Sequence, residues 1–142
     1  MTAESDRTPI HEIVRRTLTD FCTEFVAHPY LCYTEHGQHA RIFTQLHGAL
    51  PPARHHTIWR GQRVGVVQKE YPTAANLGKP KRQHWDVAVL QDPAACVPGA
   101  HPEYDYLRLA AVVEFGLNAA KGHLVEDIRR LTHPRANVAH RF

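Results

Sequence analysis

Cysteine is scarce in this 142-residue chain, and the three that occur, Cys22, Cys32 and Cys96, stand far apart. Without a Cys-x-x-Cys spacing the sequence indicates neither a zinc knuckle nor a disulfide framework. Long apolar runs are also missing, because the longest are far too short to cross a bilayer. The first ten residues, MTAESDRTPI, lack the hydrophobic core of a signal peptide. We therefore expect a cytoplasmic protein without a membrane partner.

A strong excess of one charge is absent as well. The 17 lysines and arginines exceed the 14 acidic residues by three, a net charge of +3 that permits nucleic acid as a partner without requiring it. Histidine is unusually frequent, with 12 residues, but neither His-x-His nor His-Glu-x-x-His occurs. A histidine zinc site is therefore a minor alternative. Its candidate ligands are His36, His39, His84 and His123.

The length suggests one domain over residues 9–142, preceded by a flexible polar segment, 1–8. Apolar residues at helical spacing predict helices over 9–27, after Thr34 as N-cap, and over 121–131, the last with Leu124, Ile128 and Leu131 on one stripe. Strands are expected over 63–73, 84–90 and 107–118, and the tail has room for one more. This order predicts an α/β (α+β) fold, in which helices flank a mixed central sheet with a strand meander.

Three carboxylates interrupt patterns that otherwise belong to a core. Glu35 lies one helical turn before His39 on the inward face of the second helix, Asp86 lies within HWDVAVL, and Glu114 lies within AAVVEFGLN. A buried carboxylate is costly unless it has a partner, a proton or a metal. If the last two strands are adjacent, Asp86 and Glu114 lie close together, and a divalent cation such as Mg²⁺ would relieve their repulsion.

Each acid also has an ordinary structural explanation. Asp86 could cap a helix or pair with an arginine, and Glu35 suits the positive end of a helix dipole. Glu70, near the end of its strand, could be exposed. Glu114 is the hardest to explain this way, because it lies in the middle of an apolar run. The hypothesis of a functional site therefore rests on the set of acids and their order.

This order resembles the PD-(D/E)xK nuclease superfamily, whose restriction-endonuclease-like fold has a three-layer core. Glu35 in YTEHGQHARIFTQL matches the helix acid of that family, Asp86 matches its aspartate, and Glu114 in VVEFGLN matches its (D/E) position. The segment QKEYPT looks like one found in uncharacterised bacterial members. The resemblance covers roughly residues 20–132. It implies hydrolysis of phosphodiester bonds with Mg²⁺ or Mn²⁺ on Asp86 and Glu114, and with Glu35 assisting through water.

The lysine of the family motif is replaced by Gly116 in this sequence. Lys121, at the start of the next helix, is the preferred substitute for this catalytic cation, and Lys69 is the other. The basic loop with Lys79, Lys81 and Arg82 is expected to contact nucleic-acid phosphates, with DNA favoured over RNA. Alternatively, the loss of the lysine leaves a catalytically inactive module that binds nucleic acid or a protein.

The resemblance also ends early, because the family usually adds a strand and a helix after the motif helix, and ANVAHRF can provide little of either. An exposed sheet edge there would favour pairing with a second copy of the chain. We therefore expect a homodimer.

Overall fold

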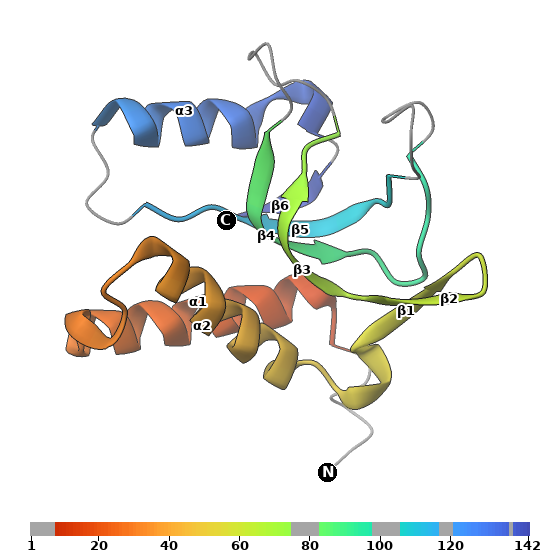
Figure 1. Ribbon diagram of the computed structural model, residues 1–142, viewed down its shortest axis with the longest axis horizontal. Helices are drawn as coiled ribbons and strands as arrows, with labels where there is room; N and C mark the ends of the chain where they lie inside the picture. Colours follow the sequence, from red (N-terminus) through yellow and green to blue (C-terminus); the bar gives the residue numbers. More distant parts are fainter. Residues whose placement is uncertain (1–7, 75–82, 98–105, 117–120, 137) are drawn as a thin grey trace.

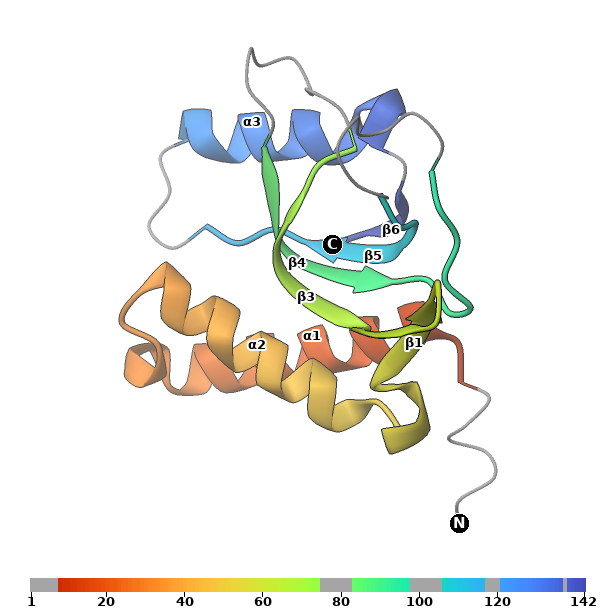
Figure 2. The ribbon, with the colours of Figure 1, turned by 45° about the vertical axis from the view of Figure 1, so that its right-hand side comes forward.

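The computed structural model describes residues 8–74, 83–97, 106–116, 121–136 and 138–142. They form an α+β fold in which α1 and α2 cover one face of a mixed sheet and α3 covers the other (Figures 1 and 2). This confirms the fold class expected from the sequence. In chain order the elements are α1 (Ile10–Ala27), the 3-10 helix η2 (Pro29–Leu31), α2 (Glu35–Ala49), η3 (Pro52–Arg54), β1 (His56–Trp59), β2 (Gln62–Gly65), β3 (Val67–Pro72), β4 (His84–Leu90), β5 (Leu109–Val113), α3 (Lys121–Thr132), η4 (Pro134–Ala136) and β6 (Val138–Arg141).

The two N-terminal helices begin and end where the sequence predicts. Pro9 precedes α1, and the Thr34 hydroxyl caps α2 by accepting a 3.0 Å hydrogen bond from the Gly37 N–H. Across the helix pair, Glu24 of α1 accepts hydrogen bonds from Arg41 and Gln45 of α2. These contacts fix α2, and therefore its first turn, relative to α1.

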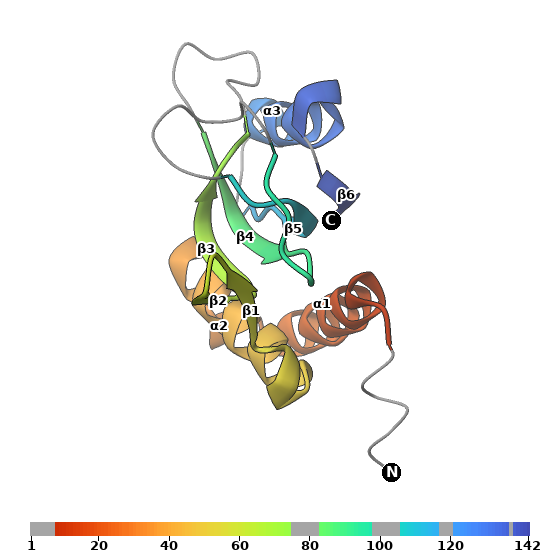
Figure 3. The same ribbon diagram turned by 90° about the vertical axis from the view of Figure 1, so that its right-hand side faces the viewer.

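The main sheet has the strand order β3-β4-β5-β6. The first three strands are antiparallel neighbours and form the expected meander, whereas β6 pairs parallel with β5 at the edge. The short strand anticipated in the tail is therefore present. Figure 3 views the molecule from its side, with α3 on one face of this sheet and α1 and α2 on the other.

A hairpin that the sequence analysis missed precedes the sheet. β1 and β2 pair antiparallel and are joined by Arg60 and Gly61, whose φ angles of 47° and 76° suit a two-residue hairpin turn. The strand predicted over 63–73 is consequently wrong as a single element. It divides at Val66, whose N–H bonds to the His55 carbonyl and whose carbonyl accepts from Leu90, so one run of sequence serves two sheets.

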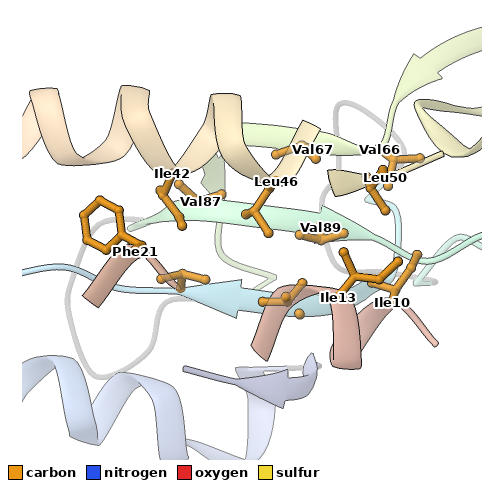
Figure 4. Packing of buried hydrophobic residues seen from close by; sticks show 13 residues of the cluster. Ile10, Ile13, Phe21, Ile42, Leu46, Leu50, Val66, Val67, Val87 and Val89 are labelled. Carbon is orange, nitrogen blue, oxygen red and sulfur yellow. The ribbon is translucent and has the colours of Figure 1, made fainter. Parts of the chain in front are cut away.

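Two apolar clusters hold the layers together. The cluster between the sheet and α1 and α2 contains Ile13, Phe21, Ile42, Leu46 and Val87 among its buried members (Figure 4). The apolar residues of α1 and α2 recur at helical intervals, so both helices bury one stripe against the sheet. The second cluster lies on the opposite face, and its buried members include Trp85, Tyr106, Leu90, Leu109 and Val112.

Helix α3 is turned differently from what its apolar spacing suggests. Of the expected stripe only Leu131 packs against the second cluster, whereas Leu124 and Ile128 are about half exposed, at 55% and 51%. Asp127 and Arg130 face inward instead, with side chains only 11% and 15% exposed. Polar contacts with the sheet therefore decide the rotation of this helix. In the described parts of the chain, no helix combines the length and the apolar composition that crossing a membrane requires.

Candidate functional site

Asp86 occupies an irregular point of the sheet. The neighbouring pairs Lys69↔Val87 and Tyr71↔Trp85 place it across from Glu70, which has a left-handed backbone with φ 53°. Such a conformation is strained for a residue other than glycine. Side-chain alternation also breaks here, because Trp85 packs in one apolar cluster and Val87 in the other. Asp86 Oδ2 accepts a 2.7 Å hydrogen bond from the Phe115 N–H, which orients the carboxylate.

Two residues of α2 approach this carboxylate from the first turns of the helix. His39 Nε2 lies 3.5 Å from Asp86 Oδ2 and 3.9 Å from Glu35 Oε1, because Glu35 and His39 are one helical turn apart. The His39 side chain is only 3% exposed, and neither ring nitrogen has a hydrogen-bond partner. Burial lowers the pKa of His39, although the charges of Asp86 and Glu35 oppose the shift. A neutral imidazole with a free lone pair is therefore favoured at neutral pH.

Glu35, His39 and Asp86 can each offer one ligand atom, and these atoms lie within 4.8 Å of one another. No other such group of three metal-binding side chains is present among the described residues. Two carboxylates suit Mg²⁺ and Mn²⁺, and an imidazole shifts the preference toward transition ions. The donor set therefore fits the divalent metal expected from the sequence, and fits Mn²⁺ better than Mg²⁺. The unpartnered nitrogens of His39 are the strongest indication that something else binds here.

Glu114 lies near this cluster but outside it. It follows the last residue of β5 instead of occupying the middle of a strand, and its N–H donates to the Phe142 carbonyl. Its side chain is 4% exposed, and Oε1 lies 2.9 Å from Arg130 Nη2, within ion-pair distance although not aligned as a hydrogen bond. Burial raises the pKa of Glu114 to about 9, and the negative charge of Asp86 adds to the shift. A proton and an arginine thus accompany the carboxyl that the sequence assigned to a metal.

Arg130 links α3 to the sheet. Besides Glu114, it contacts Asp127 Oδ1 at 3.0 Å and donates to the His84 carbonyl at 3.4 Å. Its guanidinium carbon lies 5.6 Å from the centre of the Trp85 ring, a cation–π arrangement. Burial raises the pKa of Asp127, against the opposing charges of His123 and Arg130. Arg130 therefore contacts two buried acids, the protonated Glu114 and Asp127.

Among the candidate catalytic and nucleic-acid-binding cations, the structure describes the side chain of Lys69 alone. Lys79, Lys81 and Arg82 lie outside the described residues, and Lys121 begins α3 with a side chain that is likewise outside the description. Lys69 is exposed and lies opposite Val87, whose side chain packs toward α1 and α2. Directly paired residues share a face of the sheet. The charge of Lys69 accordingly helps to lower the pKa of His39, which places this cation near the cluster.

The other candidate zinc ligands do not join the cluster. The exposed His36 packs its ring edge-on to His39, with centroids 5.7 Å apart. His84 is exposed on β4, and His123 Nδ1 lies 3.4 Å from Asp127 Oδ2 on α3. Within the described residues, His39 is the one candidate histidine that belongs to the group of three.

Sequence reasoning missed the roles of Arg130 and Asp127. The available signal was their spacing, because an acid and an arginine three positions apart on a helix are neighbours on its surface. Their burial could not be read from that spacing, since the apolar stripe of α3 indicated a different inward face.

Comparison of the chain with known protein families, with curated proteins and with solved structures finds no significant match in any of the three.

Proposed function

We propose that the protein is a divalent-metal-dependent phosphodiesterase that acts on nucleic acid, built on a restriction-endonuclease-like core. The observation that carries the proposal is His39, a buried imidazole without a hydrogen-bond partner, which lies within 4 Å of a carboxylate from each of two elements. The order of elements adds support. A helix with Glu35, a strand meander with Asp86 and a following acid occur in the sequence that the family resemblance requires.

In this proposal Glu35, His39 and Asp86 hold the metal. A bound Mn²⁺ or Mg²⁺ would polarise the phosphate and lower the pKa of a bound water. The Phe115 N–H fixes one oxygen of Asp86. The Glu114 carboxyl, whose raised pKa keeps it protonated at neutral pH, donates a hydrogen bond to Asp86. Glu114 is thus a positioning residue and not a metal ligand.

Lys69 supplies the catalytic cation that the family motif has at the position of Gly116. It lies on the α2 side of the sheet, and its charge acts on His39. A fixed cation beside a reacting phosphate stabilises the negative charge that develops in the transition state. Its place on β3, and not two residues after Glu114, explains how a chain with glycine at the motif position could remain active.

The competing function is a catalytically inactive module that binds nucleic acid or a protein. Gly116 is the observation that favours it, because the family motif has its lysine at this position. Both functions predict the same fold and the same surface. They differ in whether the cluster binds a metal and whether a phosphodiester is cleaved.

Calorimetric titration with Mn²⁺ tests the site without a substrate. The wild type should bind one ion, and His39→Gln and Asp86→Asn should each weaken binding by about tenfold or more, because each removes a ligand. Glu114→Gln should keep its affinity within about threefold, since the glutamine amide can still donate to Asp86 as the protonated carboxyl does. Glu12→Gln, a change of a partly exposed glutamate that pairs with Arg15 within α1, serves as the control. Loss of binding in Glu114→Gln alone would restore Glu114 as a ligand and contradict the assignment.

Cleavage of labelled DNA in Mn²⁺ then separates the two functions. We expect wild-type activity that Asp86→Asn abolishes. Lys69→Ala should lower the rate about 100-fold while Mn²⁺ affinity is retained, because the lysine acts on the transition state and not on the metal. Equal and metal-independent background in all three proteins would favour the inactive module.

A further inference from the structure

The last turn of α1 and the segment that joins it to α2 present an unusual amount of apolar surface to solvent. Val26, Tyr30 and Tyr33 are 81%, 76% and 80% exposed, and Leu31 between them is about half exposed. In the rest of the described chain, large hydrophobic side chains with comparable exposure occur only on α3 and at Ile58. Single exposed apolar residues are ordinary, but a group of them marks a binding surface. This segment lies at one end of the molecule, on the left in Figure 1.

Tyr30 and Tyr33 lie side by side within this surface. Their ring centroids are 5.8 Å apart, and the ring planes are inclined by 34°. The rings are held by ordered backbone, because Tyr30 belongs to η2 and Tyr33 immediately precedes the N-cap of α2. Two aromatic rings with open faces on a fixed backbone form a platform on which planar groups can stack.

The platform borders the candidate metal cluster. Tyr33 is two residues before Glu35, which begins α2 and contributes one of the three ligand atoms. The first turn of α2 lies beneath the residues that follow β5 in Figures 1 and 2, where His39 packs against Phe115 with ring centroids 5.3 Å apart. If a nucleic acid had a phosphodiester at the cluster, one of the two directions of its chain would lead over the tyrosines.

We propose that Tyr30 and Tyr33 form a stacking site for the unpaired bases of a single-stranded nucleic acid. The inference rests on the proposed function, which supplies the phosphodiester next to the platform. Every base has a π face, so stacking on aromatic rings tolerates any sequence. In a duplex these faces are covered by neighbouring bases. The site therefore prefers single strands or frayed ends to intact duplex, which names the substrate class that the metal cluster alone leaves open.

The test is a binding measurement by fluorescence anisotropy at low salt with EDTA, so that no cleavage occurs. The probes are labelled oligothymidylate of about 12 nucleotides and a duplex of the same length, a size suited to such surfaces. The wild type should bind the single strand more tightly than the duplex. The double variant Tyr30→Ala, Tyr33→Ala should bind the single strand about tenfold or more weakly, and bind the duplex unchanged.

Two further proteins separate stacking from other causes. Tyr30→Phe, Tyr33→Phe keeps both rings and should retain single-strand affinity within about twofold, since stacking needs the ring and not the hydroxyl. Ile58→Ala removes an exposed apolar side chain from β1 and should change nothing. All three variants alter exposed side chains, and each should unfold at the wild-type temperature.

The proposal is overturned if the wild type does not prefer the single strand, if the double alanine variant binds it as tightly as the wild type, or if the phenylalanine variant loses as much as the alanine variant. None of these results bears on metal binding. Asp86→Asn should lose Mn²⁺ and keep the single strand, so the failure of the metal site and the failure of the stacking site are seen separately.

Discussion

Two glutamate–arginine pairs in this molecule behave in opposite ways. Glu24 and Arg41 join α1 to α2 near the surface, with side chains 33% and 36% exposed. Glu114 and Arg130 join the end of β5 to α3, with side chains 4% and 15% exposed. Hydrogen bonding to Arg41 lowers the pKa of Glu24, whereas burial raises the pKa of Glu114 to about 9. The same two functional groups therefore favour opposite protonation states.

The difference teaches that an arginine neighbour does not by itself keep a carboxyl ionised. Glu24 has Arg41 and Gln45 as donors. Arg130 is shared between Glu114 and Asp127, and the charge of Asp86 raises the pKa of both acids. One cation is thus shared by two acids in a desolvated place, and the charge of Asp86 acts on both of them. The missing positive charge has to come from protons or from a metal, which is why this region and not the surface pair is suited to a cation site.

The largest effect is expected from removing the buried cation. Arg130→Met keeps much of the side-chain volume but removes the counter-ion of the buried Asp127, together with the contacts to Glu114 and the Trp85 ring. Breaking a buried pair in this way should lower the free energy of unfolding by about 3 kcal/mol. Urea denaturation monitored by the tryptophans measures the change. Arg41→Met is the matched control and should cost far less, because its partner Glu24 remains in water. Equal losses in both variants would remove the distinction between the two pairs.

A second effect concerns the pH dependence of stability, measured with EDTA present. The folded pKa of Glu114 is raised to about 9 from 4.5, so the unfolded chain releases this proton first as pH rises. Stability that the protonated carboxyl contributes is complete below about pH 4.5 and is lost as pH rises toward 9. Glu114→Gln has no such proton. Relative to the wild type, it should therefore gain on the order of 2 kcal/mol between about pH 5 and pH 6.5.

Other titrating groups are common to both proteins and cancel in the difference between them. A difference that stays flat over this range would mean that Glu114 is ionised in the folded protein, as Glu24 is. The buried pair would then differ from the surface pair in burial alone, and the argument from charge balance would fail.

Much of the fold could be predicted because each helix and strand carries its own local signal. The stripe of α1, the Thr34 cap of α2 and the apolar run of β4 all act within a few residues. The break at Val66 could not be predicted, because it depends on hydrogen bonds to His55 and Leu90, which are distant in sequence. The rotation of α3 depends in the same way on Glu114 and Trp85, which lie outside the helix.

In the candidate site, too, the sequence predicts what depends on local spacing and misses what depends on tertiary contacts. Helical spacing brings Glu35 and His39 together, and the sequence analysis placed both on one face. It assigned the metal to Asp86 with Glu114 because adjacent strands bring acids close. Spacing alone could not tell that Arg130 reaches Glu114, or that the strained backbone at Glu70 interrupts the alternation beside Asp86. Local pattern therefore gave the residue types of the site, and tertiary contacts decided which of them act together.

The smallest effect belongs to the surface pair and has the opposite sign. The folded pKa of Glu24 is lowered from 4.5, so its contribution is present above the unfolded pKa and is lost as pH falls through the folded pKa. Glu24→Gln should lower the melting temperature slightly at neutral pH and match the wild type in acid, and added salt should shrink the difference because the pair is exposed. The comparison between the pairs requires two opposite pH trends. The stability difference between Glu24→Gln and the wild type should disappear as the pH falls, whereas Glu114→Gln should become more stable relative to the wild type as the pH rises. If the stability differences of the two variants had the same pH dependence, burial would not distinguish the surface pair from the buried pair.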